Sequence, residues 1–146
     1  MPTLIDGDNL LGTWPGRRRS DAERRKLAMQ VGRLAAREGK RFITVFDGNP
    51  PHSAAFGAGV RFSGPGKTAD ELILEILRVE QDRRGWLVVT SDRSLGDQCR
   101  YLEARVVRCD RFRGRLHGVG EGEKPERETD VEFWLNEFGG ADDPEA

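Results

Sequence analysis

The sequence predicts an α/β protein with a central, mostly parallel sheet that helices cover on both faces. Short apolar runs alternate with longer amphipathic segments, in the order strand, helix, strand, helix. Several of the apolar runs end at a turn that contains an aspartate. Strands that alternate with helices are joined by right-handed crossovers and therefore pair in parallel. The length of 146 residues fits one domain over residues 1–138, followed by an acidic segment at residues 139–146 that we expect to be disordered.

The first apolar run and the segment after it predict a strand and a helix. Residues 3–5 are apolar and stop at residues 6–9, a polar cluster of the kind that forms a turn. Ser20 and Glu23 have the spacing of a capping box, in which the hydroxyl and the carboxylate each accept a hydrogen bond from a backbone N–H. Apolar residues then recur at helical spacing up to Gly39, which supplies the expected helix end.

The middle of the chain repeats this pattern. Residues 42–46 are β-branched and aromatic and predict a strand, and residues 60–62 predict a shorter one. Thr68 and Glu71 form a second capping box, and apolar residues at helical spacing follow them. We expect this helix to end by Gly85.

The last third of the chain predicts two more strands. Residues 86–90 form the clearest buried strand, residues 95–101 a helix and residues 104–107 a final strand. A basic, glycine-containing stretch follows. A third capping box stands at Thr129 and Glu132.

The composition argues against membrane spans, secretory signals and disulfide frameworks. No apolar run approaches the roughly 20 residues that cross a bilayer, and the N-terminus lacks the basic, apolar, small order of a signal peptide. Cys99, Cys109 and two histidines are too few for a disulfide framework or an ordinary structural zinc site. We therefore expect a reduced, soluble protein of the cytoplasm with no membrane partner.

Charge is divided unevenly along the chain. Residues 1–118 hold 22 Lys and Arg against 15 Asp and Glu, a net charge of +7, whereas residues 119–146 hold 2 against 10, a net charge of −8. A basic body indicates a polyanionic partner such as nucleic acid. A solvated surface that the acidic tail balances is the simpler interpretation, and charge alone favours it.

Aspartates stand where the expected strands end. Asp6, Asp47 and Asp92 follow three of them directly or nearly so, and Asp70 lies in the first turn of a helix that follows another. Parallel strands end at one edge of a sheet, so we expect these carboxylates to converge. Like charges placed so close must take up protons or share a cation, and oxygen ligands suit Mg²⁺ or Mn²⁺. Each aspartate taken alone is more simply a turn or cap residue.

Other residues near these aspartates carry weaker signals. Asn9 offers an amide that can orient a carboxylate or a phosphate oxygen, or that can form a turn. Asp97 is a further metal ligand or a solvated helix residue, with neither interpretation favoured. Arg93 can hold a phosphate or neutralise Asp92 beside it. Asp8 we expect only to shape the turn.

Arginines gather in two clusters that suit contacts with the phosphates of RNA. One cluster precedes the first expected helix and the other follows the last expected strand. Solvated charge is the alternative for either cluster taken alone. Together with Arg93, the arginines that we expect to contact RNA are Arg17, Arg18, Arg19, Arg111, Arg113 and Arg115.

Four ordered segments resemble the NYN domains of the PIN-like nuclease superfamily, and within it the YacP-like branch. They are Leu-Ile-Asp6-Gly-Asp-Asn9, Val-Phe-Asp47-Gly, Ser63-Gly-x-x-Lys-Thr68-Ala-Asp70-Glu and Val-Val-Thr-Ser91-Asp92-Arg93. Each short motif is weak by itself, whereas the ordered set, spread over residues 3–115, is fairly specific.

The resemblance implies a PIN-like three-layer α/β/α sandwich and an endoribonuclease that depends on Mg²⁺ or Mn²⁺. In the YacP-like branch the substrate is RNA and the activity is associated with ribosomes. Asp6, Asp70 and Asp92 match the acidic metal positions of the family, and Asp47 and Asn9 match further polar positions of the site.

Two further positions match the family pattern less well. Asp97 matches a metal position less closely than the other aspartates do. Asp8 departs from the family pattern, in which an aromatic residue usually follows the glycine, and this bears on a substrate contact rather than on the metal site. The expected reaction is metal-assisted hydrolysis that leaves a 5′ phosphate and a 3′ hydroxyl.

Two alternative functions remain open from the sequence. Asp6 and Asp8 after the first strand also resemble the acid pair of a haloacid-dehalogenase-like phosphatase, which forms an aspartyl phosphate. Neither Lys67 nor Lys124 clearly occupies the place of the lysine in such an enzyme. A non-catalytic module that binds RNA or the ribosome through its basic body is the second alternative.

Overall fold

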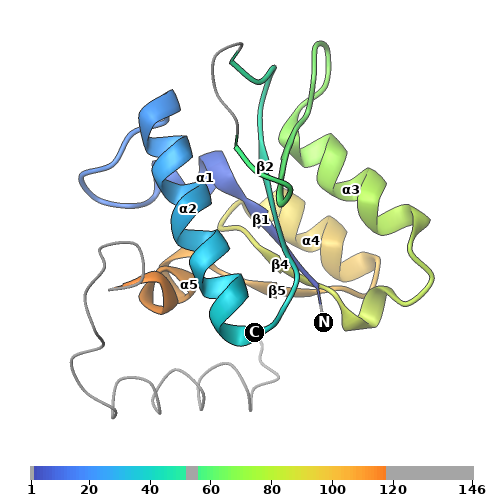
Figure 1. Ribbon diagram of the computed structural model, residues 1–146. Helices are drawn as coiled ribbons and strands as arrows, with labels where there is room; N and C mark the ends of the chain where they lie inside the picture. Colours follow the sequence, from blue (N-terminus) through green and yellow to red (C-terminus); the bar gives the residue numbers. More distant parts are fainter. Residues whose placement is uncertain (1, 52–55, 118–146) are drawn as a thin grey trace.

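The computed structural model describes residues 2–51 and 56–117, which contain a five-stranded sheet with every strand pairing parallel (Figure 1). The strand order is β3-β2-β1-β4-β5. The strands are β1 (Thr3–Asp6), β2 (Phe42–Phe46), β3 (Val60–Phe62), β4 (Leu87–Val89) and β5 (Arg105–Val107). The predicted parallel sheet is confirmed.

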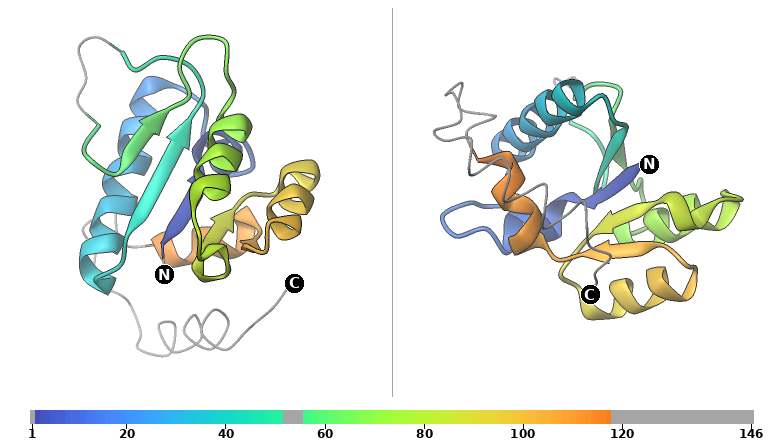
Figure 2. Two further views of the ribbon diagram at one scale, coloured as in Figure 1. Left: turned by 90° about the vertical axis from the view of Figure 1, so that its right-hand side faces the viewer. Right: turned by 90° about the horizontal axis from the view of Figure 1, so that it is seen from below.

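Helices cover both faces of this sheet, so the fold is a three-layer α/β/α sandwich (Figure 2). One face carries α1 (Gly7–Gly12), α2 (Asp21–Glu38) and α5 (Cys109–Leu116), and the other carries α3 (Ala69–Val79) and α4 (Arg93–Tyr101). A short 3-10 helix, η1 (Arg83–Gly85), leads into β4.

The two faces of the sheet have separate hydrophobic cores. Side chains along a strand alternate between faces, so Leu4 of the central strand packs with α3 and α4 while Ile5 packs with α1, α2 and α5. Both side chains are fully buried. Burial on both faces explains why these strands are continuous apolar runs in the sequence rather than alternating ones.

The strand order changes direction at β1. The chain first moves from β1 to β2 and β3, and it then returns to place β4 and β5 on the other side of β1. In open parallel sheets, functional sites usually lie beyond the carboxyl ends of the two strands at such a switch, here β1 and β4. The predicted aspartates belong to this edge.

Residues 6–9 are not the isolated turn that the sequence predicts, because α1 begins at Gly7 directly after β1. The buried side chains of Leu10 and Leu11 anchor this helix in the core. Gly7 permits the close approach, since a Cβ atom there would lie 2.4 Å from Phe46 Cε1. Polar residues at the start of α1 obscured it in the sequence.

The basic stretch after the last strand is also helical. Cys109, Phe112 and Leu116 in α5 are buried at helical spacing, although arginines stand between them. Dense positive charge concealed this apolar stripe at the level of sequence. The capping box expected at Thr129 and Glu132 and the acidic segment at residues 139–146 lie outside the described residues.

The predicted capping boxes differ in outcome. Thr68 and Glu71 form both hydrogen bonds of the box at the start of α3, as predicted. At the start of α2, Ser20 accepts a hydrogen bond from the Glu23 N–H, but the Glu23 carboxylate binds Arg17 Nε at 2.6 Å instead of the Ser20 N–H. The second half of that prediction was wrong because the guanidinium competes for the carboxylate. Within residues 2–51 and 56–117, no helix is long and apolar enough to cross a membrane.

Candidate functional site

Asp6 ends β1 at the carboxyl edge of the sheet and is almost fully buried, with 4% of its surface exposed. Its Oδ2 atom accepts a hydrogen bond from Thr90 Oγ1 at 2.9 Å, which favours the charged form. Burial outweighs this bond and is the main reason that the pKa of Asp6 rises from 3.8 to about 7. Three further carboxylates repel it and act in the same direction, those of Asp70, Asp47 and Asp92.

Asp70 lies in the first turn of α3 and is partly buried. Burial is the largest cause that raises its pKa, and the negative charges of Asp92 and Asp47 follow. Asp6 and Asp70 thus feel the same group of neighbours, although the two residues are far apart in the chain. The predicted convergence of the four aspartates is therefore visible in their electrostatics.

Asp92 is the N-cap residue of α4. Its Oδ1 atom accepts a hydrogen bond from the Leu95 N–H at 3.0 Å, while its own N–H donates to Thr90 Oγ1 at 3.1 Å. Thr90 therefore connects Asp92 to Asp6. The sequence patterns did not predict a role for Thr90, although its hydroxyl stands at the end of an apolar strand directly before a polar loop.

Asp47 connects the end of β2 to the start of α3. Its Oδ1 atom accepts a hydrogen bond from the Ala69 N–H at 2.7 Å, and its own N–H donates to Asp8 Oδ2 at 2.9 Å. Because Ala69 immediately precedes Asp70, the Asp47 carboxylate fixes the position at which Asp70 enters the site.

Asp8 forms a bidentate ion pair with Arg24 of α2. Nε and Nη2 of Arg24 donate to the two carboxylate oxygens of Asp8, each at 2.9 Å. The side chain of Asp8 is 5% exposed and that of Arg24 is 17% exposed. Asp8 therefore does more than shape a turn, because it holds α1, α2 and the end of β2 together.

Asn9 stands at the junction of α1, β4 and α5. Its Oδ1 atom accepts hydrogen bonds from the Ser91 N–H at 2.7 Å and from Cys109 Sγ at 3.3 Å. Ser91 Oγ in turn accepts from the Cys109 N–H at 2.9 Å. Burial raises the pKa of the Cys109 thiol, which keeps it protonated and able to donate. In this arrangement Asn9 orients the segment that leads to Asp92.

The carboxylates are gathered but do not form a closed ligand set. Within the described ranges, 2–51 and 56–117, no three His, Cys, Asp or Glu side chains stand close enough together to hold a metal ion as they are placed. The donors are nevertheless carboxylate oxygens, which hard divalent cations prefer. A cation beside Asp6 would also offset the burial and the repulsion that raise its pKa. By donor chemistry the residues fit Mg²⁺ or Mn²⁺.

Asp97 stands apart from this group. It lies one turn into α4 with its side chain 69% exposed, and it pairs with Arg100 Nη1 at 3.3 Å. It is not among the carboxylates that raise the pKa of Asp6 or of Asp70.

Comparison with known proteins identifies the family. The chain matches the family model of the YacP-like NYN domain over residues 3–131. The protein belongs to the YacP-like NYN family. This is a family of nuclease-type domains, which confirms the resemblance drawn from the sequence motifs.

Solved structures share the fold of this YacP-like NYN protein. Two crystal structures of Rae1 (YacP) from Bacillus subtilis, the first of a tryptophan-to-leucine variant, have TM-scores of 0.67 and 0.68 at 20% and 19% sequence identity. They cover 97% and 94% of this chain, and this chain covers 85% and 83% of them. No curated protein matches the sequence.

The first arginine cluster of the YacP-like NYN domain divides into two groups. Arg18 and Arg19 are exposed on the loop before α2. Arg17 is directed inward, where its Nη1 donates to Gln30 Oε1 at 3.0 Å and its guanidinium carbon lies 4.4 Å from the centroid of the Trp14 ring. Together with the bond to Glu23, these contacts use Arg17 to fasten the loop to α2.

The arginines of α5 divide in the same way. Arg111 is exposed, as is Arg93 at the start of α4. Arg113 Nη1 donates to the Thr13 carbonyl at 2.9 Å, and Arg115 pairs with Glu38 of α2. Arg113 and Arg115 thus join α5 to neighbouring segments of the protein.

Proposed function

We propose that this YacP-like NYN protein is a divalent-metal-dependent endoribonuclease that hydrolyses phosphodiester bonds within RNA. One observation carries the proposal. The carboxylate of Asp6 is buried at the switch point of the sheet, where three more aspartates from three other segments repel it. A protein gains little stability from such a group unless a cation or a reaction uses it.

The proposed metal-holding residues are Asp6, Asp70 and Asp92. Mg²⁺ or Mn²⁺ bound there would supply the means to activate water and to stabilise charge on the leaving 3′ oxygen. Thr90 holds the Asp6 carboxylate by the 2.9 Å hydrogen bond. Asp47 holds the start of α3 and thereby Asp70. Asp97 is not part of the proposed set.

Arg93 is the residue proposed to hold the scissile phosphate. It directly follows Asp92 at the start of α4, and its side chain is exposed. A guanidinium at this position offers a bidentate donor to phosphate oxygens next to the carboxylates. The products expected from this chemistry carry a 5′ phosphate and a 3′ hydroxyl, and messenger RNA on cytoplasmic ribosomes is the substrate context that the family resemblance implies.

Incubation with end-labelled single-stranded RNA tests this function. Wild-type protein and the Asp92→Asn variant are compared with Mn²⁺, with Mg²⁺ and with EDTA, and the ends of the products are mapped. We expect metal-dependent internal cuts with 5′ phosphates for the wild type only. Asparagine also caps helices well, so the variant keeps the start of α4.

Cleavage that continues in EDTA, or in the Asp92→Asn variant, would contradict the assignment. If free RNA is left intact, the same pair of proteins is tested on translating ribosomes. RNA binding in EDTA without cleavage in either setting would identify a binding module instead.

The phosphatase alternative is less well supported by the geometry. Its second acid, Asp8, is held by both nitrogen donors of Arg24 and also accepts from the Asp47 N–H. A carboxylate with these partners is poorly placed to donate a proton to a leaving group. Release of phosphate from small phosphoesters would nevertheless favour that alternative.

A further inference from the structure

A small pocket lies against β3, the edge strand of the sheet beside β2. We call it the β3 pocket, and its volume is about 330 Å³. Ligand sites span about 300 to 1,000 Å³, so the β3 pocket suits one small ring system rather than a large ligand. It is lined by Pro50, Phe56, Gly57, Val60, Arg61 and Phe62.

Two phenylalanine rings form a corner in the β3 pocket. The ring centroids of Phe56 and Phe62 lie 5.2 Å apart, and the ring planes meet at 76°. Both residues are only partly buried. A flat ring that stacks on one of them meets the other edge to face, and aromatic groups favour both arrangements. The corner therefore has the shape that a flat aromatic group requires.

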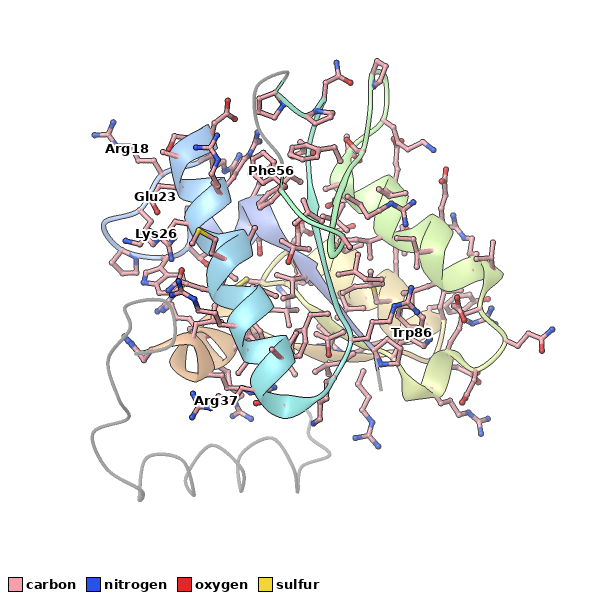
Figure 3. The ribbon with its side chains drawn as sticks, in the orientation of Figure 1. Arg18, Glu23, Lys26, Arg37, Phe56 and Trp86 are labelled. Carbon is pink, nitrogen blue, oxygen red and sulfur yellow. The ribbon has the colours of Figure 1, made fainter. Side chains whose placement is uncertain are left out.

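Arginines stand beside this corner. The guanidinium carbon of Arg25 lies 5.7 Å from the centroid of the Phe56 ring, and Figure 3 shows Phe56 next to the N-terminal half of α2. Arg25 and Arg61 are both exposed. A nucleotide complements such a site, because its base is flat and its phosphate is negative. An apolar side chain of a protein partner would use the rings and leave the charges unmatched.

Phe46 connects the β3 pocket to the candidate site. Its buried ring lies 5.6 Å from the Phe62 ring, centroid to centroid, and it also packs against Gly7, the residue after Asp6. Phe46 pairs with Phe62 in the sheet, and Asp6 pairs with Val45. The β3 pocket and Asp6 are therefore at the same edge of the sheet.

The distance along this edge suits a strand of RNA. β3 lies two strands from β1, a separation of about 10 Å. One strand carries a phosphate about every 3.4 Å even when it is stacked in a duplex. A nucleotide within about three positions of a bond held at the carboxylates can therefore reach the β3 pocket.

We propose that the β3 pocket binds a base of the RNA strand close to the bond that is cut. The base packs into the corner of Phe56 and Phe62, and Arg25 pairs with a neighbouring phosphate. This proposal rests on the proposed function, because it takes RNA as the substrate. Stacking accepts any base but requires one that is free of a duplex, so the β3 pocket selects single-stranded RNA.

Equilibrium binding in EDTA tests the β3 pocket without cleavage. Wild-type protein is titrated with a labelled oligouridylate and with a ribose-phosphate oligomer of equal length and charge that lacks bases. We expect the wild type to bind the oligouridylate about tenfold more tightly, because one stacked base contributes about that much. Phe56→Leu keeps an apolar side chain but removes the ring, so it should lose the preference. Its affinity for the oligomer without bases should equal that of the wild type.

Two further variants separate stacking from other effects. Phe56→Tyr keeps the ring and should retain the preference of the wild type. Tyr101→Leu is the matched control, because it removes an aromatic ring that is 87% exposed at the end of α4, on the other face of the sheet. It should retain the preference as well. Thermal unfolding of each variant shows that it is folded.

The comparison of the two oligomers gives a result even before any variant is made. Equal binding of both by the wild type would overturn the proposal and favour a protein side chain as the occupant of the corner. A full preference in Phe56→Leu, or its loss in Tyr101→Leu, would also overturn it. A wild type that prefers the oligouridylate but leaves RNA uncut with Mn²⁺ would contradict the nuclease and support the β3 pocket.

Discussion

Asp6 and Asp8 lie two residues apart at the same edge of the sheet, and both are almost fully buried. The groups around them differ in charge. Asp8 meets the two donors of Arg24 and a backbone N–H. Asp6 accepts a hydrogen bond from one hydroxyl and is repelled by the charges of three other carboxylates. One carboxylate therefore holds the fold together, while the other stays in an unfavourable environment that a cation would improve. Burial and residue type alone do not distinguish a structural acid from a functional one, whereas the partners do.

The largest effect is expected from removal of the charge of Asp6. Asp6→Asn should lower cleavage about a thousandfold, about 4 kcal/mol in transition-state energy, because the proposed cation would lose one of its ligands. The buried amide fits the same space, so the protein should remain folded. Measurement of kcat with Mn²⁺, alongside circular dichroism, checks both statements. Wild-type rates in this variant would remove Asp6 from the site.

The pH dependence of stability should report the same residue. The pKa of Asp6 is about 7 in the folded protein and 3.8 when unperturbed, so the folded state binds the proton more tightly. The stabilising contribution of the protonated form is complete below pH 3.8 and is lost as pH rises to about 7, on the order of 4 kcal/mol in all. Asp70, whose pKa is also raised, acts in the same direction.

Urea unfolding at pH 5 and at pH 8 in EDTA measures this decline. The Asp6→Asn variant is the control and should show a flatter profile, and Mn²⁺ at pH 8 should restore the stability of the wild type. Equal pH profiles for the variant and the wild type would contradict the raised pKa of Asp6.

Removal of the Asp8 carboxylate should destabilise the folded protein, unlike removal of the Asp6 carboxylate. Asp8→Ala removes the bidentate partner of the largely buried Arg24, which keeps only the exposed Asp21 at 3.6 Å, and is expected to lower the free energy of unfolding by about 2 to 3 kcal/mol. Urea unfolding at pH 8 gives the value. Glu38→Gln, which disturbs another partly buried ion pair of α2 far from the carboxylates, is the control for a general effect of ion-pair loss. An Asp8→Ala protein as stable as the wild type would contradict the structural role of Asp8.

Thr90 should have a smaller and more specific effect. Thr90→Val keeps the shape but removes the hydroxyl that donates to Asp6 and accepts from the Asp92 N–H, so the pKa of Asp6 should rise further and kcat/KM should fall about tenfold, about 1.4 kcal/mol. The pH profile of Mn²⁺ binding should move to higher pH. Thr90→Ser retains the hydroxyl and should behave as wild type. An unchanged pH profile of Mn²⁺ binding in Thr90→Val would contradict the role of Thr90 in holding the Asp6 carboxylate.

Asp97 should matter least. Asp97→Asn disturbs an exposed pair with Arg100 and is expected to change the free energy of unfolding by less than about 0.5 kcal/mol, with cleavage unchanged. Stability and cleavage rate measured side by side with Asp92→Asn provide the comparison. A large loss of cleavage would return Asp97 to the ligand set.

The sequence determined the sheet and most of its helices, because their signals are local. Strands buried on both faces are continuous apolar runs. The capping box of Thr68 and Glu71 predicts the start of α3 from four consecutive residues. The sequence did not predict helices α1 and α5, because polar or charged residues in both interrupt the apolar pattern. Asp8 and Asn9 disguised the start of α1, and arginines disguised the buried side of α5.

The sequence also determined that Asp6, Asp47, Asp70 and Asp92 share one edge, since parallel strands place their ends together. Only the tertiary structure decided what each acid meets there. Arg24 reaches Asp8 from another helix, and Thr90 reaches Asp6 across 84 positions of the chain. The same holds for the arginines, because Arg17 turns inward to Gln30 while Lys26 faces outward. The sequence gives the charge of each side chain, but the effect of that charge depends on partners and burial that exist only in the folded chain.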